Sequence, residues 1–352
     1  MINNPAKQLT GLRIIFMGTP GFAVASLDAL VNAGYNIVAV ITAPDKEAGR
    51  GMQLQQSAVK EYAVEKGLTV LQPEKLKDPE FITKLKTFNA DLQVVVAFRM
   101  LPEVVWDMPP MGTVNLHGSL LPQYRGAAPV NWAVINGEKE TGVTTFKLKQ
   151  EIDTGNILIQ ESFPIGENES AGDVHDKMKI IGAALLVKTV KRLAEGILDE
   201  KPQGAIVSRE PSVVSEELSH ESTFTPHYSA LTTLKHAPKI FTETCMINWN
   251  KPVNEVHNLI RGLAPYPTAF TFLDNKKLKI FAAHIVVDLQ SADGTGNNDN
   301  KTAGGILTDK KTYLHFTCSD GLIAIDELQL EGKKKMKVED FLRGYRFLNK
   351  GS

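Results

Sequence analysis

Cysteine is scarce in this chain. The sequence holds two, Cys245 and Cys318, which lie far apart and have neither a second cysteine nor a histidine at the spacing of metal ligands. This scarcity excludes a disulfide scaffold and argues against a zinc site, which takes its four ligands from closely spaced residues. We therefore interpret both thiols as buried side chains without a catalytic role, and we expect no bound metal.

Long hydrophobic runs are also missing. The longest apolar stretches, such as VVVAF at 94–98, are far too short to cross a bilayer, which takes about 20 residues. The first residues, MINNPAKQLTG, lack the positive charge and apolar core of a secretory leader. We expect a cytoplasmic protein with no membrane segment.

The chain has almost no net charge, because 39 Lys and Arg face 40 Asp and Glu. A nucleic-acid partner would have to be bound by a local basic patch rather than attracted by the field of the whole molecule. Two segments could form such a patch: the loop APDKEAGRGMQLQQ at 43–56, with Lys46 and Arg50, and KKKMK at 333–337. The first is long for a connection between a strand and a helix and is predicted to lack regular structure. The alternative is that each segment is a solvated surface with incidental charge, which is the more common explanation of a short lysine cluster such as KKKMK.

The pattern of apolar residues predicts the fold of the first part of the chain. From Leu12 to about Leu198, short β-branched runs alternate with amphipathic ones, which is typical of an open, doubly wound, mostly parallel sheet covered by helices. Strands are expected at 12–18, 36–42, 91–98, 112–118, 142–148 and 157–165, and helices at 21–34, 57–67, 128–137 and 170–198.

The composition changes near Lys201. An irregular mixture of Pro, Ser, Thr and His predicts a surface linker at 201–238, between a first domain at 1–200 and a second at 239–352. Short apolar runs separated by Gly, Asp and Lys turns predict that the second domain is a small β-barrel of the OB-like kind. At 352 residues, two domains are the ordinary expectation.

The turn FMGTPGFA, which begins at Phe16, lies where a doubly wound fold binds a dinucleotide. The three-glycine fingerprint is incomplete, since no third glycine follows Gly18 and Gly21 at the required place. Asp45 follows a proline inside the long loop instead of ending the second strand. A nicotinamide oxidoreductase is therefore disfavoured, although the turn could still bind a small substrate at the carboxyl edge of the sheet.

Three polar residues are better candidates for chemistry. Asn115 and His117 are two apart in a predicted strand, so their side chains share one face while Val114 and Leu116 point into the protein. Asp153 follows a neighbouring predicted strand, in the segment QEIDTGNIL. The three can meet in the crevice at the carboxyl ends of the strands, where open α/β sheets bind ligands.

This trio has no nucleophile of its own. No Gly-x-Ser-x-Gly elbow surrounds Ser119, and neither cysteine is near the histidine in the sequence. An amide and an imidazole can stabilise a developing oxyanion while a carboxylate orients the imidazole. The pattern therefore suits a substrate that brings its own nucleophile, such as an amine.

The segments IIFMGTP, NLHGSLLPQYRGAAP and GVTTFKLKQEIDTGNIL resemble, in order and spacing, the folate-dependent formyltransferases. The resemblance implies that Asn115, His117 and Asp153 are the catalytic trio and that 10-formyltetrahydrofolate is the formyl donor, released as tetrahydrofolate. It further implies that the folate cleft is lined by a strand end and a turn. Their residues are Phe98, Arg99, Met100, Leu101, Ser119, Leu120, Leu121 and Pro122.

The loop PDKEAGRG, the linker and the later segment NLIRGLAPYPTAF resemble family members whose acceptor is the amine of methionine on initiator methionyl-tRNA. This implies tRNA contacts at Lys46 and Arg50, in a protein that we expect to be a monomer. The segment FRMLP departs from many relatives and leaves the role of Arg99 open. An amino-sugar nucleotide as acceptor, and a non-catalytic RNA-binding module, remain alternative interpretations.

Overall fold

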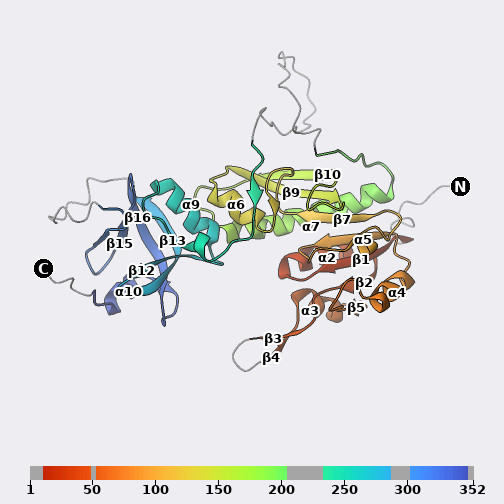
Figure 1. The fold of residues 1–352 in the computed structure, drawn as a ribbon, viewed down its shortest axis with the longest axis horizontal. Helices are drawn as coiled ribbons and strands as arrows, with labels where there is room; N and C mark the ends of the chain where they lie inside the picture. Colours follow the sequence, from red (N-terminus) through yellow and green to blue (C-terminus); the bar gives the residue numbers. More distant parts are fainter. Residues whose placement is uncertain (1–10, 49–52, 204–232, 287–301, 348–352) are drawn as a thin grey trace, which may run out of the picture. The chain divides into compact units, whose positions relative to one another are not determined.

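The computed structural model describes residues 11–48, 53–203, 233–286 and 302–347. The chain divides into two compact units (Figure 1). The first comprises Met1–Arg125, Gly142–Ser162 and Met178–His236, and the second Gly126–Thr141, Phe163–Lys177 and Ala237–Ser352. The domain limits predicted from composition stay a prediction, and residues 204–232 of the predicted linker lie outside the described residues.

The main sheet has seven strands in the order β10-β9-β7-β6-β1-β2-β5. Strands β5, β2, β1, β6 and β7 are parallel, and β9 runs antiparallel to β7. Their bounds are β1 Arg13–Gly18, β2 Asn36–Ile41, β5 Val70–Leu71, β6 Leu92–Val96, β7 Thr113–His117, β9 Glu140–Lys147 and β10 Ile157–Pro164. The prediction of an open, mostly parallel α/β sheet is confirmed.

The pattern predicted four of the helices around this sheet: α2 Gly21–Asn32, α3 Ala58–Glu65, α6 Pro129–Ile135 and α7 Ala171–Ala194. It did not predict α4 Pro79–Thr87 and α5 Glu103–Trp106. Ser57 caps α3 by accepting a hydrogen bond from the Lys60 amide, and Gly34 and Gly67 follow α2 and α3 with positive φ, as expected of helix ends. Among the described helices, none has the length and apolar character needed to cross a bilayer.

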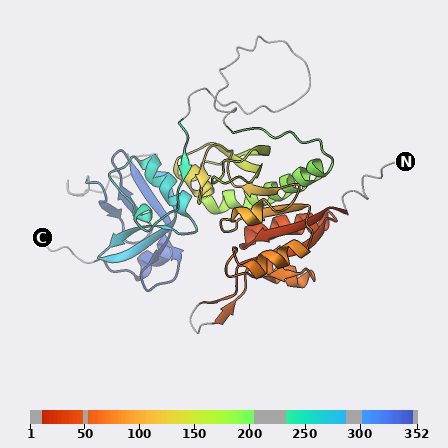
Figure 2. The ribbon, with the colours of Figure 1, turned by 45° about the vertical axis from the view of Figure 1, so that its right-hand side comes forward.

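The long loop after β2 contains a hairpin, contrary to the prediction that it lacks regular structure. Strands β3 Lys46–Ala48 and β4 Gln53–Gln55 pair antiparallel, and the views show them projecting away from the sheet strands of their unit (Figures 1 and 2). Two three-residue strands are too short for the apolar alternation that marks a strand in sequence. Residues 49–52, including Arg50, lie outside the described part of the chain.

The second unit is built around an antiparallel sheet in the order β12-β13-β16-β15-β14, with β17 also paired to β16. These pairings form an open path, so the predicted barrel is a half-barrel. The elements are η1 Glu243–Cys245, α9 Val253–Leu263, β12 Ala269–Leu273, β13 Lys276–Val286, β14 Ile306–Thr308, β15 Leu314–Thr317, β16 Leu322–Leu330, β17 Met336–Lys337 and α10 Val338–Gly344. Helix α9, which the strand-based interpretation missed, packs on β13.

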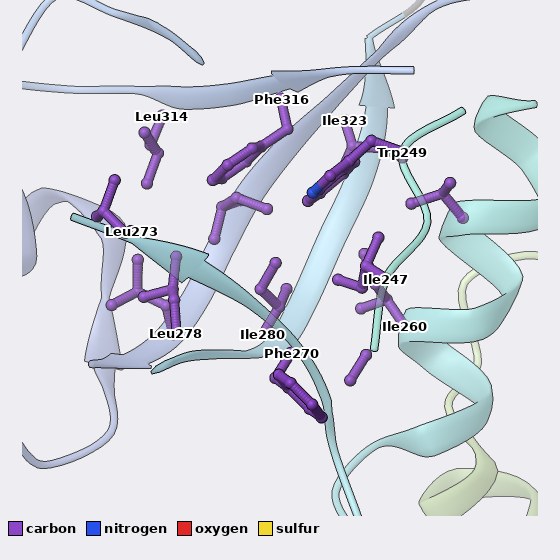
Figure 3. Close-up of a cluster of buried hydrophobic side chains, with 14 of the residues drawn as sticks. Ile247, Trp249, Ile260, Phe270, Leu273, Leu278, Ile280, Leu314, Phe316 and Ile323 are labelled. Atoms are coloured by element: carbon purple, nitrogen blue, oxygen red, sulfur yellow. The ribbon is translucent and has the colours of Figure 1, made fainter. Parts of the chain in front are cut away.

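An apolar core joins this sheet to α9 (Figure 3). Trp249 stacks on Phe316 with ring centroids 4.5 Å apart, and its indole N–H donates to Thr271. Both cysteines are buried here, and burial raises the pKa of the Cys318 thiol to about 11. The interpretation of the cysteines as buried side chains is confirmed, and a thiol so hard to ionise is a poor nucleophile.

Candidate active site

Strand β7 ends with the two polar residues that the sequence singled out. Val114 and Leu116 are buried, and Asn115 and His117 alternate with them, as a period of two requires. In the register with β9, Asn115 lies opposite Phe146 and His117 opposite Thr144. Because β7 lies between parallel β6 and antiparallel β9, its carboxyl end is held on both sides.

The His117 ring has a polar group near each nitrogen. Nε2 lies 3.0 Å from the backbone carbonyl oxygen of Tyr124, and Nδ1 lies 3.7 Å from Oδ2 of Asp153. A carbonyl can only accept, so Nε2 carries a proton in this arrangement. The distance to Asp153 is long for a hydrogen bond and suits a bridging water or substrate atom. The ring edge faces the buried Phe146, with centroids 6.4 Å apart and the planes at 81°.

The turn between β9 and β10 brings Asp153 to the histidine. Asp153 has a φ of 53°, in the left-handed region, and its side chain is 13% exposed. Gly155 allows this turn to lie against β9, since a Cβ there would come within 1.6 Å of the Lys147 carbonyl oxygen. The structure therefore brings together His117 and Asp153, which are 36 positions apart, as the sequence pattern predicted.

Two further residues near this cluster were missed by the sequence interpretation. Tyr124 supplies the carbonyl that accepts from His117, and the buried Gln203 donates to the backbone carbonyls of Asp153 and Gly155. These contacts involve backbone oxygen atoms, and every residue type has one. No sequence pattern could have identified them.

The predicted folate-lining turn at 119–122 is closely held. Ser119 is fully buried and donates to the Gln123 carbonyl. Leu121 is also fully buried, its amide donates to the Thr144 hydroxyl, and its carbonyl accepts from the Gln160 amide. Pro122 is buried and Leu120 half-buried. Burial and these hydrogen bonds hold the turn in place, and its contact with folate stays a prediction.

The predicted strand end at 98–101 has side chains in different environments. Leu101 is buried in a core cluster, against which the half-buried Phe98 packs, and Met100 is 72% exposed. Arg99 donates to the backbone carbonyls of Pro73 and Glu74 and lies over the Phe98 ring. These contacts give Arg99 a structural role at this edge, and a role in folate binding remains untested.

The base of the β3–β4 hairpin is held by a second polar cluster. Asp45 pairs with Lys60 and accepts from the Gln72 amide at 2.7 Å, and that amide also donates to the Ala43 carbonyl. Hydrogen bonds from Gln72 and Lys60 lower the pKa of the Asp45 carboxyl. Both oxygens of Asp45 are thus engaged within the protein, which disfavours it further as a ribose ligand.

Lys46, the first residue of β3, is exposed. Arg50, the other predicted tRNA contact, lies outside the described residues. Within the described ranges, no group of three or more His, Cys, Asp or Glu side chains is arranged to hold a metal ion. The expectation of no metal stays a prediction.

Comparison with known families gives two matches along the chain. The formyl transferase family model matches residues 12–190, and the model of the formyl transferase C-terminal domain matches residues 239–346. Among curated proteins, the methionyl-tRNA formyltransferase of Azobacteroides pseudotrichonymphae is 49% identical, covering 96% of this chain and 97% of its own length. The methionyl-tRNA formyltransferase of Parabacteroides distasonis is 50% identical, covering 95% and 96%.

Solved structures share the fold. An N-formyltransferase from Helicobacter canadensis, in complex with folinic acid and dTDP-3-aminofucose, aligns with a TM-score of 0.59 and 21% identity. The alignment covers 92% of this chain and 100% of that one. At 21% identity this similarity shows that the two chains share a fold. It does not show that they formylate the same acceptor.

Proposed function

We propose that this chain, which belongs to the formyl transferase family, transfers the formyl group of 10-formyltetrahydrofolate to the α-amine of methionyl-tRNA. The observation that carries the proposal is the approach of His117 to Asp153, with Asn115 two positions earlier on the same strand. Two relatives named methionyl-tRNA formyltransferase are about half identical to this chain over nearly its whole length. Their identity supports methionyl-tRNA as the acceptor.

The reaction proposed is a direct transfer. The neutral methionyl amine attacks the formyl carbon, forming a C–N bond and an oxyanion. Collapse of this intermediate breaks the bond to the folate nitrogen, which takes up a proton and leaves as tetrahydrofolate, while the amine loses one. The acceptor brings the nucleophile, so the enzyme need only place the groups and stabilise charge.

Each member of the trio has a separate role in this proposal. The Asn115 amide donates a hydrogen bond to the oxyanion, and the His117 ring donates another from Nδ1 once it has taken up a second proton, since its Nε2–H bonds the Tyr124 carbonyl. Asp153 lies beside Nδ1, where a carboxylate stabilises the ring when it takes up a proton and can relay that proton through water. The turn at 119–122 and the strand end at 98–101 are proposed to hold the folate.

Two basic surfaces are proposed to hold the tRNA. One is the hairpin with Lys46 and the Arg50 segment, and the other is the lysine cluster at 333–337 of the C-terminal domain. With the domain limits 1–200, 201–238 and 239–352, each of the two folded domains would carry one of these surfaces. We further propose that the protein is a monomer that works in the cytoplasm and requires no metal.

One assay tests the proposal. The protein is incubated with 10-formyltetrahydrofolate and methionyl-tRNA, the product is deacylated, and formylmethionine is measured against reactions that lack either folate or protein. We expect formylmethionine to accumulate with multiple turnovers. Formylation of an added amino-sugar nucleotide in preference to methionyl-tRNA would contradict the acceptor, and tRNA binding without transfer would contradict the enzyme.

A further inference from the structure

Gln203 has a buried side-chain amide that joins two loops of the first unit. Its Nε2 donates to the backbone carbonyls of Asp153 and Gly155, each at 2.8 Å. Its Oε1 accepts from the Arg125 guanidinium, with Nε at 2.9 Å and Nη2 also in contact. The residue is 3% exposed, follows α7 in the chain and lies 50 positions from Asp153.

The orientation of this amide is fixed by its partners. Backbone carbonyls only accept and a guanidinium only donates, so the nitrogen must face the Asp153 turn and the oxygen must face Arg125. Both protons and both lone pairs of the amide are used. Breaking this arrangement would leave polar groups unsatisfied in a buried place, which favours a single conformation of both loops.

These two loops are the ones that contact the His117 ring. The turn held by the Gln203 nitrogen carries the Asp153 carboxylate near Nδ1, and Arg125 directly follows Tyr124, whose carbonyl accepts from Nε2. Both loops also contain residues with positive φ, Asp153 at 53° and Tyr124 at 59°. Such conformations are costly for residues other than glycine and persist when surrounding contacts enforce them.

We propose that Gln203 is a positioning residue, which fixes the His117 ring by holding the loops on both of its sides. The proposal rests on the proposed function, in which His117 stabilises the oxyanion. Gln203 itself touches neither substrate nor the reacting atoms in this mechanism. Its loss should therefore impair the chemical step, because a displacement of about 1 Å in a catalytic group can cost about a hundredfold in rate.

Two variants distinguish the role of the Gln203 hydrogen bonds from that of the space which its side chain fills. Gln203→Ala removes the whole amide, whereas Gln203→Glu keeps the size and the acceptor for Arg125 but has no N–H for the two carbonyls. We expect kcat to fall about tenfold to a hundredfold in both, with KM for each substrate within about threefold of the parent. If Gln203→Glu retained parental kcat, the donation to the Asp153 turn would be irrelevant and the proposal overturned.

Gln93→Ala is the matched control. Gln93 is another fully buried glutamine of the same unit, on β6, and its side-chain oxygen accepts from the Thr113 hydroxyl at the opposite end of β7 from His117. Its loss should lower stability without changing kcat in the folded fraction. If kcat fell equally in Gln93→Ala, the loss in the Gln203 variants would be explained by general destabilisation, and the proposal would be overturned.

A measurement on the free protein distinguishes this proposal from the proposed function. The ring nitrogens of ¹⁵N-labelled histidine are observed by NMR, and His117→Gln identifies the His117 signals among those of the eight histidines. We expect the His117 nitrogen shifts to change in Gln203→Ala and Gln203→Glu but not in Gln93→Ala. Unchanged shifts would overturn the positioning role. Changed shifts in a protein that formylates no methionyl-tRNA would uphold it while refuting the function.

Discussion

Two buried regions, one in each unit of this chain, are built from different kinds of side chain. In the first, the carboxyl end of β7 is surrounded by buried polar residues, including His117, Ser119, Thr144 and Gln203. In the second, the sheet and α9 enclose a largely apolar core in which Trp249 stacks on Phe316. Burying polar groups is costly unless each finds a partner, whereas apolar burial stabilises without direction.

This difference indicates where each unit can tolerate change. A polar cluster contributes little net stability, because its hydrogen bonds replace hydrogen bonds to water, but it fixes geometry. An apolar core contributes stability in proportion to the area removed from water. Substitutions in the first unit's cluster should therefore change activity more than stability, and substitutions in the second unit's core the reverse.

The largest expected effect is that of His117→Ala on turnover. Loss of one donor to an oxyanion costs about a hundred- to a thousandfold in rate, so kcat for formylmethionyl-tRNA formation should fall by that factor. Circular dichroism should show the parental fold. The matched control is His175→Ala, on α7, which removes a half-exposed histidine beside Asp176 and should leave kcat unchanged. Activity of His117→Ala within about threefold of the parent would exclude His117 from the proposed chemistry.

Trp249→Ala should have the largest effect on stability. Truncation of a buried aromatic side chain costs about 3–5 kcal/mol, and here it also removes the stack on Phe316 and the bond to Thr271. The free energy of unfolding is measured by denaturant titration of the full chain. Phe272→Ala on β12, an aromatic that is 55% exposed, is the control and should cost about 1 kcal/mol or less. Equal costs would mean that the stack at Trp249 is not central to this core.

The same contrast explains how much of the fold could be predicted from the sequence. The buried strands of the first unit are apolar runs, and glycines such as Gly34 and Gly67 mark helix ends, so most strands and helices were predictable. The short β5, α4 and α5 were missed. The direction of each strand was not predictable, because nothing in the sequence of β9 marks it as antiparallel to β7. Helix α9 was missed because the turns around it are typical of a β domain.

The site was predictable only where side chains carry the signal. Asn115 and His117 could be paired from their spacing, and Asp153 could be added because it follows a neighbouring predicted strand. Tyr124 could not be found, because it acts through its backbone carbonyl, which every residue type has. Gln203 could not be found either, because the carbonyls to which its side-chain amide donates belong to a turn about 50 positions earlier that only the fold brings near. Leu101 and Leu121, predicted near folate, are buried, and both polar backbone groups of Leu121 are hydrogen-bonded within the protein.

The smallest expected effect is that of Asp45→Asn, a change in the polar cluster at the base of the β3–β4 hairpin rather than in the one around His117. Asp45→Asn breaks the charged pair with Lys60 at the base of the hairpin and should leave kcat unchanged, since the cluster around His117 is intact. We expect KM for methionyl-tRNA to rise about threefold, because the loosened hairpin presents Lys46 and the Arg50 segment less uniformly to the phosphates.

The pH dependence and a matched control sharpen this prediction. The hydrogen bonds that lower the pKa of Asp45 keep its carboxylate charged in the parent, so the difference in KM should be constant between about pH 6 and 8. Glu65→Gln removes the same charge from an exposed pair with Lys66 on α3 and should leave KM unchanged. A rise in KM that is equal in both variants would reflect net charge alone. A fall in kcat for Asp45→Asn would instead show that the two polar clusters are coupled, and that the division between recognition and chemistry within this unit is wrong.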